Sequence, residues 1–140
     1  MKRALVLFHS RTGTTATYGE EIAGELIQNG VDARALPLYK ASNSELADAD
    51  TLFIGCWTSG LLFFMQHPEK DFINYLDKIS DLSNKKIVLF TTYKILTGSM
   101  FRSMSRHLPG TPEISRVRMR SRTGRLSKDD KGRIHILAAL

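Results

Sequence analysis

Short apolar runs alternate with amphipathic stretches along the whole chain, and this alternation limits the fold more than any other feature of the sequence. The first run, residues 4–8, is continuous and bounded by polar residues, as expected of a parallel strand buried on both faces. Residues 15–29 then carry apolar side chains at helical spacing, and Gly30 follows where a helix-ending glycine belongs. The same reasoning predicts four more strands, at residues 31–38, 51–57, 86–92 and 114–122.

Helices are expected between the later strands as well. Residues 44–49 allow a short one. Pro68 suits the first position of a helix, and the acidic residues just after it suit the positive end of the helix dipole. Ser99 can cap another helix. Ser127 and Asp130, three residues apart, resemble a capping box at the start of a last helix.

Strands that alternate with helices form βαβ units, whose right-handed crossovers produce a parallel sheet covered by helices on both faces. The chain has 140 residues, which fits one domain over residues 1–140. We therefore predict an α/β fold, a three-layer doubly wound sandwich with a five-stranded parallel sheet. Ligands of such sheets bind beyond the carboxyl ends of the strands, which points to the loops at residues 9–14, 57–68 and 92–99.

The first of these loops is rich in hydroxyl groups and opens a helix. Hydroxyl donors and the free N–H groups of a helix N-terminus suit a phosphate ester, and a glycine lets the backbone approach it closely. Other phosphate sites fit poorly, since the sequence has neither the Walker-type P-loop pattern nor GxGxxG. Cys56 has a leucine, not an arginine, six residues later, which counts against a cysteine phosphatase. The predicted phosphate-binding residues are Ser10, Arg11, Thr12, Gly13, Thr14 and Thr15.

The pattern Ser10-x-Thr12-Gly13-x-Thr15 resembles the Ser/Thr-x-Thr-Gly-x-Thr loop that binds the FMN phosphate in the flavodoxin family. It also stands where the family has it, after the first strand and within the first fifteen residues. The order of elements and the length resemble a short-chain flavodoxin over nearly all of the chain. The resemblance implies a flavodoxin-like sheet with strand order 2-1-3-4-5, and FMN as the cofactor with its phosphate on residues 10–15.

The resemblance also implies where the flavin ring lies, between the loops after the third and fourth strands. Aromatic side chains commonly stack on that ring, and Trp57 and Tyr93 are the candidates in this chain. The Ser59–Gly60 peptide is expected to change orientation with the redox state, because glycine tolerates both states. The predicted cofactor-binding residues of these two loops are Trp57, Thr58, Ser59, Gly60, Thr92, Tyr93 and Gly98.

The net charge of +6 is concentrated in the last part of the chain. Residues 1–110 hold 12 Lys/Arg against 11 Asp/Glu, whereas residues 111–140 hold 8 against 3. Arginines occupy every second position of the fifth predicted strand and would share one face of it, so this strand must lie at an edge of the sheet. The stripe is expected to protect that edge, or to dock an acidic partner or the phosphates of NADPH. Its members are Arg116, Arg118, Arg120 and Arg122.

Together these features predict an FMN-binding, flavodoxin-like protein that acts in electron transfer. It would exchange electrons with a redox partner protein, for which an acidic protein is one candidate, or with NAD(P)H or a small oxidant. One alternative is a small FMN-dependent NAD(P)H or quinone oxidoreductase, and another is a binding module of the same fold that has lost FMN. Neither catalytic side chains nor a metal site are expected. Nucleic acid is not an expected ligand, because no recognition motif accompanies the arginine stripe.

The remaining expectations concern the surroundings of the protein. Cys56 is the only cysteine, so no internal disulfide can form, and a reducing cytoplasm is the simplest compartment. The densest apolar runs, residues 4–8 and 61–65, have five residues each, far fewer than the ~20 that a membrane span needs. The protein is expected to be a monomer or a weak homodimer.

Overall fold

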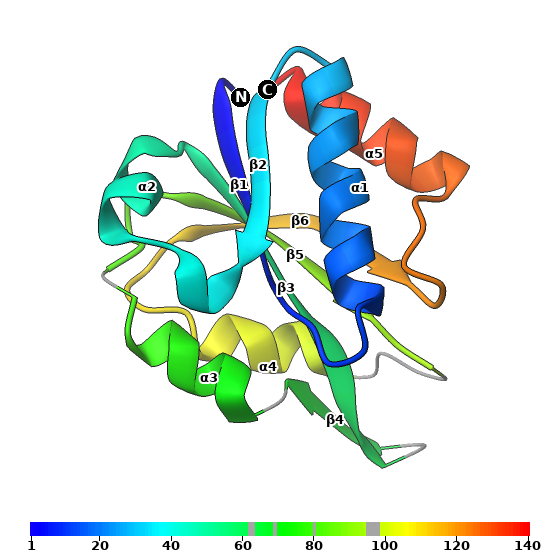
Figure 1. Cartoon of the computed structure of the whole chain (residues 1–140). Coiled ribbons are helices and arrows are strands. Elements are labelled where there is room, and N and C mark those ends of the chain that lie inside the picture. The colour runs from blue at the N-terminus through cyan, green and yellow to red at the C-terminus, as the bar shows by residue number, and fades with distance from the viewer. Residues whose placement is uncertain (62–63, 69, 80, 95–98) are drawn as a thin grey trace.

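The computed structural model of the protein describes residues 1–61, 64–68, 70–79, 81–94 and 99–140 (Figure 1). The strands are β1 (Arg3–His9), β2 (Asp32–Pro37), β3 (Thr51–Leu61), β4 (Phe64–Pro68), β5 (Lys86–Thr92) and β6 (Glu113–Ser121). The helices are α1 (Thr14–Gln28), the 3-10 helix η1 (Leu38–Lys40), α2 (Asn43–Asp48), α3 (Lys70–Asp77), α4 (Met100–Arg106) and α5 (Lys128–Ala138). Within the described ranges, no helix combines the length and the apolar character needed to cross a membrane.

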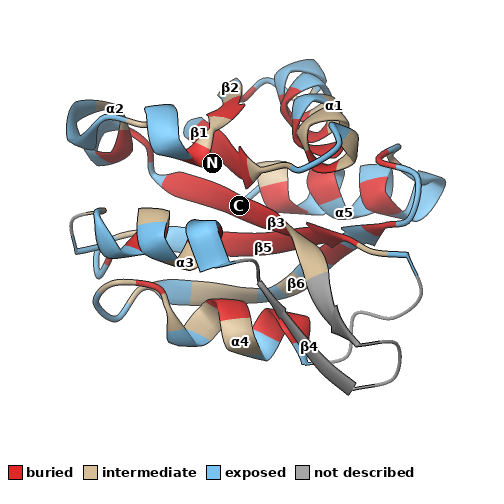
Figure 2. Cartoon of the chain, turned by 60° about the horizontal axis from the view of Figure 1, so that its bottom comes forward, coloured by how far each residue is buried: buried red, intermediate tan, exposed pale blue. Residues whose placement is uncertain are grey.

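Five strands form a parallel sheet in the order β2-β1-β3-β5-β6, while β4 pairs antiparallel with β3. Because β4 comes between the third and fourth predicted strands, this is the predicted order 2-1-3-4-5, which is confirmed. Helices α1 and α5 cover one face of the sheet, and α2, α3 and α4 cover the other (Figures 1 and 2). The predicted three-layer, doubly wound sandwich is therefore confirmed.

The continuous apolar runs of the central strands serve both layers of the core. In β1, Leu5 and Leu7 pack on the side of α3 and α4, while Val6 and Phe8 pack on the side of α1 and α5. Side chains alternate along a strand, so a strand between two helical layers needs apolar residues at every position. Within the sheet, β3 and β5 pack closely at Gly55, where a Cβ atom would lie 2.1 Å from the ring of Phe90 on the neighbouring strand.

The segment predicted as a loop at residues 57–68 is instead largely a β-hairpin, so that prediction was wrong. Strand β3 continues beyond the sheet to Leu61 and pairs with β4, with Thr58 opposite Pro68 and Ser59 opposite His67. Pairing of this kind satisfies backbone N–H and C=O groups that a long loop would leave to water. Pro68 ends β4 rather than beginning a helix, as a residue without an N–H can at the end of a strand.

Two predicted helix ends are confirmed. Gly30 follows α1 with a φ of 84°, in the left-handed region that glycine adopts without strain. At the start of α5, the N–H of Asp130 donates to Ser127 Oγ at 3.0 Å, and the N–H of Ser127 donates to Asp130 Oδ2 at 3.4 Å. The predicted capping box is therefore present. Asp130 also accepts a hydrogen bond of 2.8 Å from the buried Tyr18 hydroxyl, which joins α5 to α1.

Strand β6 lies at the edge of the sheet, as the arginine stripe predicted. Three arginines of the stripe lie in β6 and Arg122 follows it directly. All four are exposed, whereas Met119 and Ser121 on the alternate positions are buried. The pairing of β6 with β5 shifts between Ile87 and Leu89, which leaves an irregularity near the middle of β6. An irregular edge strand lined with charged side chains resists edge-to-edge association, so the predicted protective role is consistent with this geometry.

Candidate functional site

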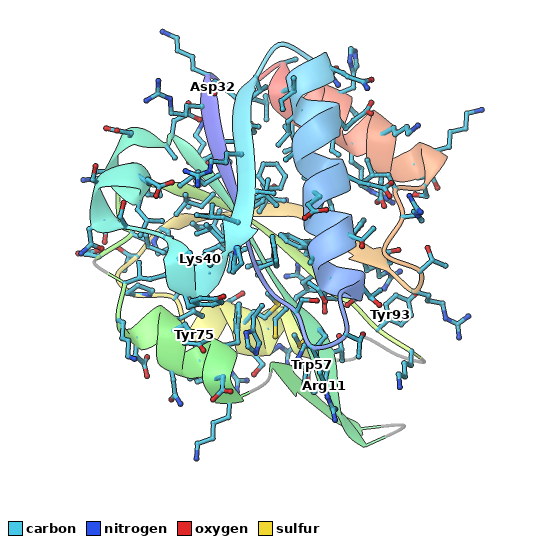
Figure 3. All side chains as sticks on the ribbon, viewed as in Figure 1. Arg11, Asp32, Lys40, Trp57, Tyr75 and Tyr93 are labelled. Carbon is cyan, nitrogen blue, oxygen red and sulfur yellow. The ribbon has the colours of Figure 1, made fainter. Side chains whose placement is uncertain are left out.

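The sheet reverses its order at β1, because the chain moves outward to β2 and then returns to place β3 on the other side of β1. Parallel α/β sheets bind their ligands at such a point, beyond the carboxyl ends of the strands. In this protein the start of α1, Trp57 at the end of the sheet portion of β3, and Tyr93 after β5 all lie at that end (Figure 3). The fold thus brings together the described parts of the three predicted loops.

The loop between β1 and α1 carries exposed or half-buried hydroxyl groups that are held by one another and by the backbone. The N–H of Gly13 donates to Ser10 Oγ at 3.0 Å, and the hydroxyl oxygens of Thr12 and Thr14 lie 3.4 Å apart. Gly13 has a φ of 94°, and no atom of its surroundings lies within 4 Å of the position of an added Cβ. The loop is therefore held together by its own hydrogen bonds, and the space beside Gly13 is open to solvent.

The N-terminus of α1 adds backbone donors to this loop. The first bond of the helix runs from the N–H of Thr17 to the carbonyl of Gly13, at 2.9 Å. The N–H groups of Thr14, Thr15 and Ala16 therefore have no acceptor within the helix. Three such groups at the positive end of a fifteen-residue helix attract an anion.

Hydrogen bonds between threonines tie the loops of the site together. Thr15 Oγ1, in the first turn of α1, lies 2.6 Å from Thr92 Oγ1 at the end of β5, and both side chains are buried. Thr91 Oγ1 lies 2.6 Å from the carbonyl oxygen of Cys56 and 2.8 Å from Thr58 Oγ1. A hydroxyl has one proton, so when Thr91 donates to the carbonyl of Cys56, Thr58 is the donor to Thr91.

Arg11 covers the ring of Trp57. The guanidinium carbon lies 5.3 Å from the ring centre, which is the geometry of a cation–π contact, and Figure 3 shows the two side chains together below the start of α1. Trp57 is half-buried, and its Nε1 is fully buried without a hydrogen-bond partner among the described residues. A buried N–H without an acceptor costs about 1–3 kcal/mol, so it marks a position where an acceptor would be favourable.

An arginine also lies over the second predicted aromatic residue. Arg122, just after β6, is 5.9 Å from the ring centre of Tyr93. Its Nε and Nη2 atoms donate to the carbonyl oxygen of Lys94 at 3.1 and 2.9 Å, which fixes the guanidinium beside the loop that follows β5. The N–H of Tyr93 donates to the carbonyl of Ser121 at 3.2 Å. Tyr93 is therefore held against the edge strand.

Three predicted cofactor residues are less fully described. Ser59 and Gly60 lie in the hairpin of β3 and β4, where the pairing shifts between Ser59 and Leu61. Such an irregularity suits the flexible backbone of Gly60. Gly98 lies outside the described residues. The roles of these residues toward a cofactor stay predictions.

Two residues of this end of the sheet were not singled out from the sequence. Thr91 bridges β3 and β5 through its contact with Thr58. The sequence shows only that Thr91 is one of two consecutive threonines at the end of a predicted strand. The contact with Thr58 follows from the register of β3 and β5, which the sequence does not show. Gly124, in the loop after β6, has a φ of 82°, and a Cβ there would lie 2.6 Å from the carbonyl oxygen of Thr14. Any other residue at that position would push against the start of α1.

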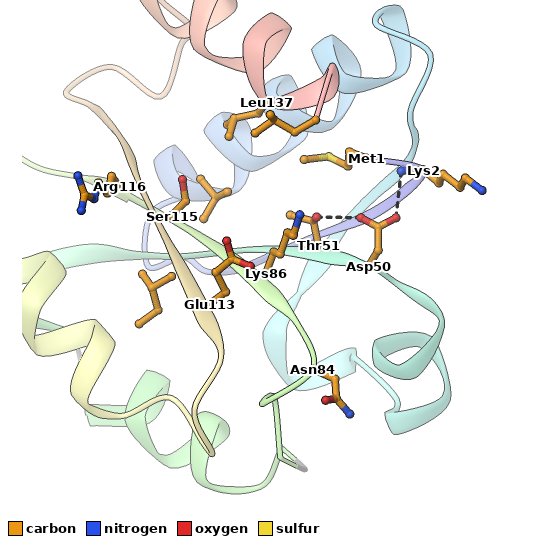
Figure 4. Close-up of a pocket in the computed structure, with 13 residues that line it drawn as sticks. Met1, Lys2, Asp50, Thr51, Asn84, Lys86, Glu113, Ser115, Arg116 and Leu137 are labelled. Carbon is orange, nitrogen blue, oxygen red and sulfur yellow. Dashed lines mark hydrogen bonds between the residues drawn. The ribbon is translucent and has the colours of Figure 1, made fainter.

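A cavity of about 700 Å³ lies at the opposite end of the sheet (Figure 4). Asp50 at its wall accepts hydrogen bonds of 2.9 and 2.8 Å from the N–H groups of Lys2 and Arg3, and one of 2.8 Å from the Thr51 hydroxyl. Partial burial raises the pKa of Asp50, but these hydrogen bonds outweigh it and lower the pKa overall. The carboxylate ties β1 to β3, which is a structural role. Other residues that line the cavity are Lys86, Glu113 and Arg116.

Comparison with known proteins gives a consistent result. Residues 5–107 match a family model described as a flavodoxin domain, and no curated protein matches the sequence significantly. Similar solved structures include a flavodoxin from the domain Archaea, with a TM-score of 0.72 and 16% identity over 97% of this chain and 93% of that one. They also include the two-electron reduced flavodoxin of Megasphaera elsdenii, with a TM-score of 0.70 and 17% identity over 98% and 99%.

The same fold occurs within larger proteins. The rubredoxin oxygen:oxidoreductase of Desulfovibrio gigas matches with a TM-score of 0.72 and 12% identity, over 99% of this chain but only 35% of that one. At identities this low the structural matches show the fold alone. The match to the family model is stronger evidence than these structural matches, because it covers well over half of the chain.

Proposed function

Because this chain belongs to the flavodoxin domain family, whose members are electron-transfer flavoproteins, we propose that it binds FMN and exchanges electrons with a redox partner protein. We propose the carboxyl ends of β1, β3 and β5 as its site. One observation carries the proposal, namely the open hydroxyl loop at residues 10–15 above the N-terminus of α1. When bound, FMN supplies the redox chemistry by taking up and releasing electrons, and the protein holds and tunes it.

The donors of the first loop fit a phosphate ester. Thr12 is exposed, Ser10 and Thr14 are half-buried, and each hydrogen bond from their hydroxyls to a charged group would contribute about 1.5–3 kcal/mol. The N–H groups at the start of α1, which have no acceptor within the helix, and the dipole of that helix add to this. The open space beside Gly13 leaves room for close approach. Thr15 would contribute its N–H only, because its hydroxyl is buried against Thr92.

The surroundings of Trp57 fit a flavin ring. The unpartnered Nε1 of Trp57 is a donor, and a flavin ring carries carbonyl and nitrogen acceptors at its edge. Flat stacking on Trp57 would require the guanidinium of Arg11 to leave the ring face that it now covers. Arg11 is exposed and belongs to the loop between β1 and α1, so its side chain can move away without a change in the fold.

We test the proposal by the cofactor content of the purified protein. The expected result is a yellow protein that releases FMN on denaturation, identified by mass. Release of FAD, or failure of the colourless protein to bind added FMN, would contradict it. Incubation with NAD(P)H alone then separates an electron carrier, which stays oxidised, from a self-sufficient reductase, which is bleached.

We also propose a cytoplasmic location. The only cysteine, Cys56, is buried in the core, so the fold makes no use of an oxidising compartment. Localisation of a fluorescent fusion to the chain tests this directly.

A further inference from the structure

The edge strand β6 and the helix α4 together carry an exposed basic surface, which we call the α4–β6 face. Helix α4 lies beside β6, at the edge of the sheet that β6 forms (Figure 2). From residue 99 to residue 122 the sequence contains a single carboxylate, Glu113. Within the same stretch it contains six arginines, all of them exposed, and these define the face: Arg102, Arg106, Arg116, Arg118, Arg120 and Arg122.

Among the described residues, five of the six arginines of this face lack the nearby carboxylate that other arginines of the protein have. Elsewhere, four arginines each have a carboxylate oxygen within 3.1 Å, in the pairs Arg3–Asp32, Arg34–Glu45, Arg125–Glu21 and Arg133–Asp130. Among the residues with described surroundings, no carboxylate lies within salt-bridge distance of Arg102, Arg106, Arg116, Arg118 or Arg122. The face therefore projects positive charge into solvent.

Two arginines of the α4–β6 face are fixed in place. Arg118 lies over the ring of Phe101 at 5.6 Å, which joins β6 to α4. Arg122 is held by its two hydrogen bonds to the carbonyl oxygen of Lys94 and lies over Tyr93. Side chains that are already ordered lose less conformational freedom when a partner binds. Through Arg122, moreover, the face reaches Tyr93, a candidate residue of the flavin site.

We propose that the α4–β6 face is the docking surface for an acidic redox protein, which it brings against the Tyr93 side of the flavin site. The electron-transfer role of the partner rests on the proposed function, whereas docking itself does not. The arrangement favours a protein over NADPH, because the arginines come from two elements and extend roughly 13 Å from Arg118 to Arg122 alone, rather than converging on one phosphate. It also favours a protein over nucleic acid, because the aromatic rings within the face are covered by arginines instead of being open for stacking.

The test measures association of the protein as purified with an acidic [2Fe–2S] ferredoxin of the plant type, used as the probe. The variant combines Arg102→Gln with Arg118→Gln, one change from each element. The matched control combines Lys128→Gln with Lys131→Gln, which removes the same charge from two exposed positions of α5, on the other side of the sheet. Electrostatic steering raises association rates by about 10- to 1,000-fold and weakens as salt shortens the Debye length to ~10 Å at 0.1 M.

We expect the arginine variant to associate about tenfold more slowly at low ionic strength and with a flatter salt dependence, while the control follows the parent protein. Affinity for FMN should be unchanged in both, which separates docking from the cofactor site. The proposal is overturned if the parent shows no salt-dependent association, if the control loses as much as the variant, or if both keep the parental rate. It is also overturned if NADPH displaces the ferredoxin at micromolar concentration, or if duplex DNA binds the face more tightly than the ferredoxin does.

Discussion

Thr15 Oγ1 in α1 and Thr92 Oγ1 in β5 are 2.6 Å apart and buried, although 77 residues separate them in the sequence. Their hydrogen bond joins the loop after β1 to the loop after β5, so it sets the distance between the two parts of the proposed flavin site. Both residues were predicted to bind the cofactor. Because their hydroxyls bond to each other, we propose that Thr15 and Thr92 support the site, and that the exposed Thr12 and the half-buried Ser10 and Thr14 face the ligand.

The first prediction follows from this bond. Thr15→Val should lower the free energy of unfolding by about 1–3 kcal/mol, because it leaves the buried Thr92 hydroxyl without a partner. Thr12→Val, at an exposed position, should change it by less than about 0.5 kcal/mol. Denaturant unfolding of both variants without cofactor makes the comparison. Equal stability of the two variants would contradict the supporting role of Thr15.

The second prediction concerns the contact of Gly55 with Phe90. Gly55→Ala should destabilise the protein by about 1–3 kcal/mol, because its Cβ would lie 2.1 Å from the ring in a closely packed core. Gly24→Ala is the matched control, since Gly24 lies within α1 with no neighbour that a Cβ would meet, and alanine there should stabilise by about 0.5–1 kcal/mol. Thermal unfolding measures both. A neutral Gly55→Ala would show that β3 and β5 pack more loosely than described.

The third prediction concerns Tyr18 and its dependence on pH. Burial, and then the charge of Asp130, raise the pKa of Tyr18 well above its ordinary value of 10.0. A raised pKa means that the folded state favours the neutral phenol. The contribution of Tyr18 to the free energy of unfolding is therefore complete below pH 10 and is lost as the pH rises beyond 10. Tyr18→Phe should cost about 1–3 kcal/mol at pH 7, and this difference from the parent should shrink above pH 10. Urea unfolding at pH 7 and at higher pH decides it, and a constant difference would count against the prediction.

The fourth prediction uses the only tryptophan of the chain, so that fluorescence reports on the site alone. Binding of FMN should quench the emission of Trp57 in proportion to occupancy, because the flavin would lie against its ring. Arg11→Ala should shift the emission of the cofactor-free protein, since the guanidinium no longer covers the ring. Lys128→Ala, on a distant helix, serves as the control. Saturation with FMN that leaves the emission unchanged would exclude Trp57 from the site.

Much of the fold could be predicted from the sequence, because local patterns and the rules of parallel sheets agree. Strand β5 has the bounds predicted from its apolar run, residues 86–92. The capping box of Ser127 and Asp130 needs only their spacing of three residues. The edge position of β6 follows from the arginines at alternate positions, which a buried strand could not hold.

The remaining features depend on contacts between distant segments. The hairpin forms by antiparallel pairing of β3 with β4, and neither Gly60 nor Pro68 signals that pairing by itself. Whether a threonine supports the site or faces the ligand depends on register and burial, so the sequence could not separate Thr15 from Thr12. The contact of Arg11 with Trp57 likewise requires the carboxyl ends of β1 and β3 to be adjacent.

The central claim is that residues 10–15 bind the phosphate of FMN, and one titration tests it most directly. The dissociation constants of FMN and of riboflavin, which lacks the phosphate, are measured for the parent protein and for Thr12→Val. We predict that the parent binds FMN more tightly than riboflavin. Thr12→Val should weaken FMN roughly 10- to 100-fold, corresponding to the loss of about 1.5–3 kcal/mol, and leave riboflavin within about twofold. Equal affinity of the parent for the two flavins, or equal losses in the variant, would contradict the claim.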